Sequence, residues 1–262
     1  DIIFLTGKVE NKNGFHTQKN KAKFQIIEMK CVKIFGFEFY DWPSSFLNKD
    51  NVIVSVLSFA AISNLKYALL AKRKGIKFYW WGHSRNFSKH NFINYVKDKI
   101  KILVAKSGTG FLVYTKGEEE ILINDGFNPD KIIALNNTLN TVKINSIIKK
   151  ISADEIFNIK RNLDLNGFIT IGLIGRLYKL RNTEMAIKAI NIINQDKIRA
   201  KLVIIGDGPD FKPLSTKYKK NSDIIFLGAI EDQVKLAPFM LSVDFFVNPG
   251  LVGLNLVHSM AY

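Results

Sequence analysis

A glycine-rich turn near the end of the chain has the residue types and spacing that bind phosphate. The apolar strand predicted over residues 245–247 runs into the turn Asn248–Gly253, and a helix is predicted to begin at Leu254. A turn that opens a helix presents backbone N–H groups at the positive end of the helix dipole. Arg176 and Arg181 follow a different predicted strand and could meet the same anion. The pattern predicts a site for a diphosphate leaving group.

His83 is the strongest catalytic candidate in the first half of the chain. It follows the buried strand predicted over residues 76–81, at the carboxyl end, where open α/β sheets bind ligands. There it would hydrogen-bond a substrate or polarise the reacting groups. The structural alternative is a histidine that caps the next helix or stacks on Trp80 or Trp81. Arg85 and Asn86 follow His83 closely in the chain and would line the side of the site that binds a second, acceptor substrate, although a structural role is favoured for both.

Alternating strand and helix patterns along the whole chain predict α/β domains with parallel sheets covered by helices. The helix predicted over residues 62–74 ends on three cations followed by Gly75, which is a normal helix ending. Residues 32–39 are expected to form a strand. The turn Gly206–Pro209 lacks the third glycine of a dinucleotide fingerprint and is interpreted as a tight turn. A connection over residues 139–166 divides the chain into domains at residues 1–150 and 151–262.

The helix predicted over residues 91–106 is amphipathic, and one stripe of it carries four apolar residues: Phe92, Val96, Ile100 and Leu103. Such a helix could lie on a membrane surface. The alternative, which occurs more often, is that the stripe packs on a sheet.

Composition excludes several classes of protein. The chain has 262 residues, 47% of them hydrophobic, which suffices for one or two packed domains. No apolar run approaches the ~18 residues of a membrane-spanning helix, and no signal peptide is visible. Cys31 is the only cysteine, so no internal disulfide forms, and a reducing cytosol is expected.

Positive charge is concentrated in the first half of the chain. Residues 1–150 contain 24 Lys and Arg against 12 Asp and Glu, a net charge of +12. The whole chain has a net charge of +15, so most of the excess positive charge lies in this half. The basic half could face anionic lipid headgroups or a lipid-phosphate acceptor. The alternative interpretation, given equal weight, is that the lysines only solvate the surface. Nucleic acid is not expected as a partner, because the lysines are scattered and no nucleic-acid-binding module is present.

Four segments of the second half match a known family in order and spacing. They are IGLIGRLYKLRN (171–182), KLVIIGDGPDFKPL (201–214), IIFLGAI (224–230) and VDFFVNPGLVGLNLVHSMAY (243–262). With these segments the chain resembles the donor domain of retaining glycosyltransferases of the GT-B fold, in the family 4 or group 1 class. In the first half, YWWGHSRN (79–86) and residues 110–141 are similar to the acceptor domain of that family, so the resemblance covers roughly residues 50–262.

The resemblance implies two Rossmann-like domains that face a cleft, each incomplete at the chain terminus. It implies a nucleotide-diphosphate sugar as donor substrate, with no cofactor and no metal, and a lipid-linked or polysaccharide acceptor. Such an enzyme would be cytoplasmic, or peripheral on the inner face of the membrane. The resemblance assigns catalysis to His83, Arg176 and Arg181. It assigns donor binding to Lys179, Gly228, Ile230, Gly250, Leu251, Val252, Gly253, Leu254 and His258.

The departures from the family pattern are specific. The family carries two glutamates around the glycine-rich turn, and Gly250 and His258 occupy those positions here. Gly250 offers only backbone, and a neutral His258 would accept one hydrogen bond where a carboxylate accepts two. Arg181 occupies the position of the phosphate-binding lysine, with Lys179 as a rival.

Two other functions stay open at this point. The loss of both glutamates would fit a non-catalytic homologue that binds nucleotide sugar or glycan as a partner subunit. A sugar-nucleotide epimerase of the same fold would need additional acidic and histidine residues, which the sequence does not reveal.

Overall fold

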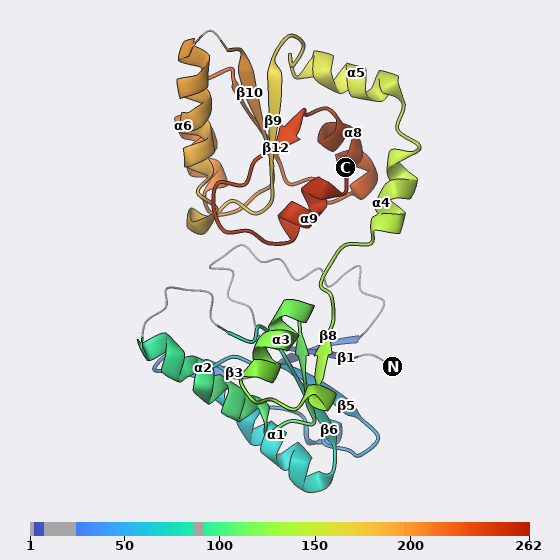
Figure 1. Cartoon of the computed structure of the whole chain (residues 1–262), viewed down its shortest axis with the longest axis vertical. Helices are drawn as coiled ribbons and strands as arrows, with labels where there is room; N and C mark the ends of the chain where they lie inside the picture. Colours follow the sequence, from blue (N-terminus) through green and yellow to red (C-terminus); the bar gives the residue numbers. More distant parts are fainter. Residues whose placement is uncertain (1–2, 8–24, 86–91, 197) are drawn as a thin grey trace. The chain divides into compact units, whose positions relative to one another are not determined.

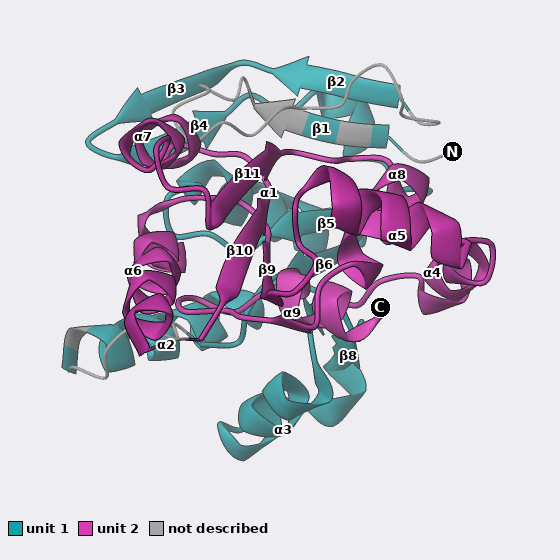
Figure 2. Ribbon diagram, turned by 90° about the horizontal axis from the view of Figure 1, so that it is seen from above, with its two compact units in different colours: residues 1–11, 15–137 teal, residues 12–14, 138–262 magenta. Residues whose placement is uncertain are grey.

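The computed structural model describes residues 3–7, 25–85, 92–196 and 198–262, which form two compact units (Figure 1). Within the described part of the chain, unit 1 ends at Asn137 and unit 2 comprises Thr138–Tyr262 (Figure 2). Each unit contains a four-stranded parallel sheet with helices packed on it, so the predicted α/β class is confirmed.

The main sheet of unit 1 has the strand order β5-β6-β7-β8. Its strands are β5 (Val52–Val56), β6 (Lys77–Trp81), β7 (Gly110–Val113) and β8 (Ile132–Ala134). The helices of this unit are α1 (Ile62–Lys74), α2 (Phe92–Ala105) and α3 (Lys116–Asn124), with short 3₁₀ turns at Ser44–Phe46 and Pro129–Lys131. Phe78, Trp80 and Phe111 lie in the core between sheet and helices.

The end of α1 follows the predicted pattern. Lys72, Arg73 and Lys74 lie in its last turn, and Gly75 adopts a left-handed conformation with φ of 69°. The cations complement the negative end of the helix dipole, and glycine takes this conformation without steric cost.

A hairpin replaces the single strand predicted over residues 32–39. Strands β3 (Cys31–Ile34) and β4 (Phe37–Tyr40) pair antiparallel around a turn in which Phe35 and Gly36 have φ of 48° and 83°. Two successive residues at positive φ reverse the chain in a way that matches the strand twist. The prediction was wrong here because Phe35 gives no turn signal. A separate parallel pair joins β1 (Ile3–Gly7) to β2 (Gln25–Met29).

The apolar stripe of α2 faces away from the body of unit 1. The exposed fractions of Phe92 and Leu103 are 79% and 70%, whereas Ile102 and Ala105 are buried. The expectation that the stripe packs on the sheet was therefore wrong. The helix packs on the core of unit 1 through Ile102 and Ala105, which lie in its C-terminal half and outside the exposed stripe.

The sheet of unit 2 has the order β11-β10-β9-β12. Its strands are β9 (Ile169–Ile174), β10 (Ala200–Ile205), β11 (Ile224–Gly228) and β12 (Phe245–Phe246). Its helices are α4 (Thr141–Ile148), α5 (Ala153–Asn162), α6 (Thr183–Ile193), α7 (Phe211–Lys217), α8 (Gln233–Leu241) and α9 (Leu254–Met260), with 3₁₀ turns at Lys179–Arg181 and Asn194–Asp196.

The strand order of unit 2 reverses at β9. The chain moves from β9 to β10 and β11 on one side and then returns to place β12 on the other side. Open α/β sheets bind ligands outside the carboxyl ends of the strands at such a reversal. The topology therefore directs attention to the segments that leave β9 and β12.

We predict that Gly206→Ala destabilises unit 2 by about 3 kcal/mol or more. Gly206 has φ of 147°, and a Cβ atom there would overlap the carbonyl oxygen of Gly175. Gly167→Ala is the matched control, because Gly167 also has a positive φ, 78°, but nothing lies within 4 Å of the added Cβ. Urea unfolding of both variants measures the difference, and equal losses would contradict the steric argument.

Candidate active site

Backbone hydrogen bonds join the turns at the carboxyl ends of β9, β10 and β11. The amide of Gly175 donates to Ile205 O at 2.9 Å, and the amide of Gly206 donates to Gly228 O at 2.8 Å. Leu177 donates to Asp207 O at 2.9 Å. The Gly206–Pro209 turn, predicted as a tight turn, thus supports the segment that carries Arg176 rather than standing as a separate loop.

Arg181 lies against the glycine-rich turn that follows β12. Its Nη1 atom donates to the Leu251 carbonyl oxygen and, over 2.7 Å, to Asn255 Oδ1. Asn255 Oδ1 also accepts a hydrogen bond from the Gly253 amide at 3.0 Å. The side chain of Asn255 therefore ties the guanidinium to the first turn of α9. The Arg181 guanidinium therefore joins the segment that follows β9 to the segment that follows β12.

The glycine at position 250 has a steric cause. A Cβ atom there would overlap Leu180 O and come within 2.5 Å of the Arg181 carbonyl carbon. The Leu251 amide donates to Leu180 O at 2.9 Å, which fixes this close approach. No side chain fits at position 250 while the turn lies on the 3₁₀ segment of Arg181.

The amides of the turn are partly used within the protein. Gly253 and Leu251 donate to Asn255 and Leu180, so these two of the amides predicted to meet an anion are already hydrogen-bonded. Residues 251 to 254 are all exposed at the surface of unit 2. The anion-binding capacity of this edge consequently depends more on arginine than on the turn.

The other predicted donor-binding residues follow the same sheet edge. Arg176 is half-buried in the turn after β9, and Lys179 is exposed at the start of the 3₁₀ segment. Gly228 ends β11 with φ of 74°, and Ile230 packs against the core cluster that contains Leu236. The structure thus places all four after strands β9 and β11.

His258 is held by the neighbouring helix. Its Nε2 atom lies 3.2 Å from Oε1 of Gln233, which also accepts a hydrogen bond from the Tyr262 hydroxyl at 2.9 Å. With this acceptor, Nε2 carries the proton of the neutral ring. Burial lowers the pKa of His258, so the ring is neutral at pH 7 and Nδ1 is its accepting atom.

In unit 1, His83 pairs with a buried carboxylate that the sequence did not reveal as functional. His83 Nδ1 lies 2.8 Å from Glu118 Oε1, and the two side chains are 54% and 5% exposed. The Glu118 carboxylate also accepts from the amides of Ser84 and Tyr114, at 3.3 and 3.0 Å. A carboxylate accepts only, so Nδ1 carries a proton and the tautomer of His83 is set.

The stacking partner of His83 differs from the predicted one, whereas the predicted capping of the next helix involves residues outside the described part of the chain. The His83 ring packs on Tyr114, with centroids 4.4 Å apart, rather than on Trp80 or Trp81. Burial, assisted by the Glu118 charge, raises the pKa of the Tyr114 hydroxyl. Glu118 belongs to the pattern Thr115-x-x-Glu118 at the start of α3, and Thr115 caps that helix. Because a threonine followed three residues later by a glutamate marks a helix start, this pattern is the sequence signal from which a fixed position of Glu118 could have been predicted.

Arg85 has a structural contact. Its Nη2 atom lies 2.8 Å from Asp125 Oδ2 at the end of α3, and Lys99 Nζ lies 3.2 Å from the other oxygen. Burial raises the pKa of Asp125, but the hydrogen bonds from Arg85 and Lys99 outweigh it and hold the pKa below its ordinary value. Asn86, the second predicted acceptor-side residue, lies outside the described residues.

Among the described residues, no group of three or more His, Cys, Asp or Glu side chains is placed to hold a metal ion. None of the helices in this part of the chain has the length and apolar character needed to cross a membrane.

Comparison with known proteins connects this fold to glycosyltransferases. Residues 169–262 match the family described as Glycosyl transferases group 1. The chain is 32% identical over 107 residues to Protein CapJ of Staphylococcus aureus, a match that covers 40% of this chain and 27% of CapJ.

Two solved structures show the same fold at low identity. HepE of Anabaena in complex with UDP has a TM-score of 0.61 at 13% identity, over 91% of this chain and 65% of HepE. The lipopolysaccharide outer core galactosyltransferase WaaB has a TM-score of 0.52 at 14% identity, over 91% of this chain and 63% of WaaB. The chain thus spans a quarter of CapJ and less than two thirds of either structure.

These solved structures show that the chain has the α/β fold found in GT-B glycosyltransferases. More narrowly, the resemblance to glycosyltransferases of group 1 is confirmed, with the family match in residues 169–262. That match contains Arg176, Arg181 and the whole glycine-rich turn.

We predict that Glu118→Ala releases the tautomer of His83. In the unchanged protein, ¹⁵N NMR of the neutral ring should show the proton on Nδ1, because Glu118 accepts it. In the variant both tautomers should be populated, and the free energy of unfolding should fall by about 1–3 kcal/mol as the Ser84 and Tyr114 amides lose their acceptor. Glu120→Ala, an exposed position on the same helix, is the control. An Nδ1 proton retained in Glu118→Ala would contradict the assignment.

Proposed function

We propose that this chain belongs to a retaining glycosyltransferase that moves a sugar, of hexosyl type, from a UDP-sugar to a lipid-linked or polysaccharide acceptor in cell-surface glycan synthesis. The observation that carries the proposal is the Arg181 guanidinium, fixed against the glycine-rich turn within the segment that matches the family. Support for the donor comes from HepE, whose crystal structures contain UDP or UDP-glucose. Support for a glycan acceptor comes from the name of WaaB.

The chemistry would turn on charge at the leaving group. When the bond between the sugar carbon and the diphosphate oxygen breaks, the electron pair stays on the oxygen and negative charge builds there. Arg181 and Arg176 would stabilise that charge, and a guanidinium that is already fixed costs no reorganisation at that moment. Lys179 is the remaining cation of the segment. We assign His83 the role of hydrogen-bonding the sugar or polarising the reacting groups, and the acceptor hydroxyl would enter on the face that the diphosphate leaves.

A non-catalytic homologue is the second candidate, and one observation favours it. Position 250 is closed to any side chain, and His258 is engaged by Gln233, so neither residue presents a carboxylate to a sugar. Such a protein would bind nucleotide sugar or glycan as a partner subunit.

We predict that Arg181→Ala lowers turnover of the full-length enzyme on the order of 100-fold, equivalent to about 3 kcal/mol of barrier, because a preorganised charge at the leaving phosphate is lost. Arg199→Ala is the control, since Arg199 stacks on Phe168 at the opposite end of the strands. Transfer is measured with a panel of nucleotide sugars, and binding by thermal shift with UDP against GDP.

The same assay separates the two candidates. Loss of turnover with retained folding in the Arg176→Ala, Arg181→Ala double variant supports the enzyme. Absence of transfer by the unchanged protein, with cellular function retained by the double variant, would favour the partner subunit.

We further propose that the protein acts at the cytoplasmic face of the membrane, as a peripheral protein attached through α2. The exposed apolar stripe of that helix is accompanied by Lys97 and Lys99, which are exposed as well. Apolar side chains would enter the boundary between headgroups and acyl chains while lysines meet anionic lipid.

Leu103→Asp should weaken binding to vesicles of phosphatidylcholine and phosphatidylglycerol about tenfold or more, since a buried leucine contributes roughly 1.5–3 kcal/mol. Val142→Asp is the matched control, because Val142 is a similarly exposed apolar residue on α4 of unit 2. Co-sedimentation measures both variants, and equal weakening would speak against α2 as the contact.

A further inference from the structure

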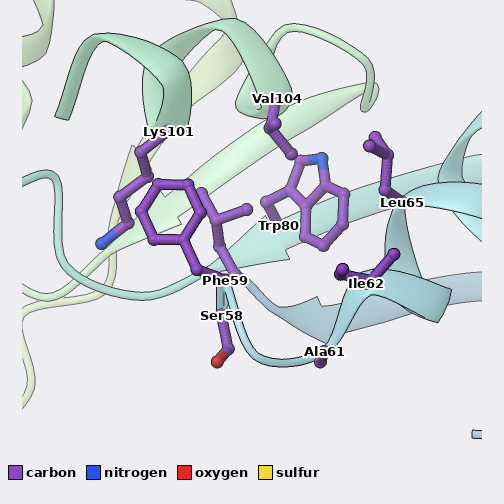
Figure 3. Close-up of a pocket in the computed structure, with 9 residues that line it drawn as sticks. Ser58, Phe59, Ala61, Ile62, Leu65, Trp80, Lys101 and Val104 are labelled. Carbon is purple, nitrogen blue, oxygen red and sulfur yellow. The ribbon is translucent and has the colours of Figure 1, made fainter. Parts of the chain in front are cut away.

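A pocket opens in unit 1 between the ends of β5 and β6 and the helices α1 and α2 (Figure 3). It has a cavity volume of about 80 Å³. The residues that line it are Leu57, Ser58, Phe59, Ala61, Ile62, Leu65, Trp80, Lys101 and Val104. Seven of these nine side chains are apolar, so the pocket favours an apolar occupant over a sugar.

The size of the pocket limits what enters it. A single water needs only about 10–15 Å³ of such space, so the cavity admits a group larger than one water molecule. That space accommodates the branched end of an aliphatic chain, and the largely apolar lining offers the hydroxyls of a hexose few hydrogen-bond partners. Trp80, 1% exposed, forms one wall and is fixed by a hydrogen bond from Nε1 to Ser107 Oγ, so the wall is rigid.

Among the described residues, Lys101 is the charged residue that lines the pocket. Figure 3 shows its aliphatic stem beside the Phe59 ring and its amino group directed away from Trp80. Burial lowers the pKa of Lys101, although the charges of Asp98 and Glu118 oppose this shift. An anion at the amino group would offset the desolvation that the lysine suffers. The pocket therefore pairs apolar walls with a cation that gains from an anionic partner.

The pocket adjoins the candidate catalytic histidine. The Leu57 amide donates to Trp81 O at 2.8 Å, and an added Cβ on Gly82 would lie 3.8 Å from Leu57 O. Gly82 directly precedes His83 in the chain. A molecule held in the pocket would thus lie at the same edge of the sheet as His83 and its partner Glu118.

We propose that this pocket binds the end of a single aliphatic chain that carries a phosphate, with the phosphate at the Lys101 amino group. The inference rests on the proposed function, of which it names the acceptor class, a glycan attached to a lipid phosphate. The chain end would enter against Trp80 and Leu65, and the phosphate would stay at the surface beside Phe59.

The test measures binding to the full-length protein, with no transfer step. Geranyl phosphate and uncharged geraniol are titrated against the protein, and tryptophan fluorescence and calorimetry follow binding. Lys101→Met should weaken geranyl phosphate about tenfold or more, because a charge-assisted hydrogen bond is lost, while geraniol binding stays unchanged. Lys106→Met, an exposed lysine directly after the same helix that does not line the pocket, should leave both unchanged.

A second variant tests the apolar walls. Val104→Trp fills the cavity and should abolish binding of both probes, and circular dichroism checks that it folds. If it does not fold, Lys101→Arg takes its place and should retain geranyl phosphate binding within a few-fold. Equal weakening in Lys106→Met and Lys101→Met would mean general attraction to a basic surface and overturn the proposal, as would absence of binding.

The outcomes separate this inference from the proposed function. Binding at the pocket without any sugar transfer would support the lipid-phosphate pocket and contradict the proposed glycosyltransferase activity. Transfer to a glycan without lipid, with geranyl phosphate neither binding nor inhibiting, would support the glycosyltransferase activity and contradict the lipid-phosphate pocket.

Discussion

Peptide groups packed directly on peptide groups hold the candidate site of unit 2 together. Gly206 lies on the Gly175 carbonyl, Gly208 on that of Leu177, and Gly250 on that of Leu180, each too close for a Cβ atom. Such contacts leave no side chain between the turns that could change rotamer. The approach of these turns to one another is therefore set by backbone contacts, and the Asn255 side chain holds Arg181 against them. Glycine is present at these sites because the approach requires it.

The strand order explains why this edge is the candidate ligand site of unit 2. β9 lies between β10 and β12, so the chain diverges on either side of it at the carboxyl end. The segments leaving β9 and β12 would separate if nothing bridged them. The backbone hydrogen bond from the Leu251 amide to Leu180 O joins them, as do the bonds from the Arg181 guanidinium to Leu251 O and Asn255 Oδ1. The strand order brings the two segments to one edge, and these hydrogen bonds hold them together.

Features with local signals are predictable from this sequence, whereas features made by tertiary contact are not. The bounds of α1 follow from its cations and Gly75, and the position of His83 follows from the strand before it. Asn255 and Glu118 escaped prediction because each acts on a residue far away in the chain, Arg181 and His83. The face of α2 that is buried could not be predicted either, because it also depends on tertiary contacts. Periodicity identifies the apolar stripe of the helix, but the surface on which the helix lies decides which face is buried.

The departure at position 250 follows from the packing of the glycine-rich turn on the segment that carries Arg181. A glutamate at position 250 would require the turn to move off Leu180, which would break the hydrogen bond from Leu251 and displace Arg181. With Gly250 and a neutral His258, no carboxylate from these positions offsets the guanidinium. For the donor that we propose, the positive charge of Arg181 would favour the diphosphate, and recognition of sugar hydroxyls by these two positions would fall to backbone groups. A site built this way should bind the nucleotide diphosphate more firmly than it discriminates among sugars.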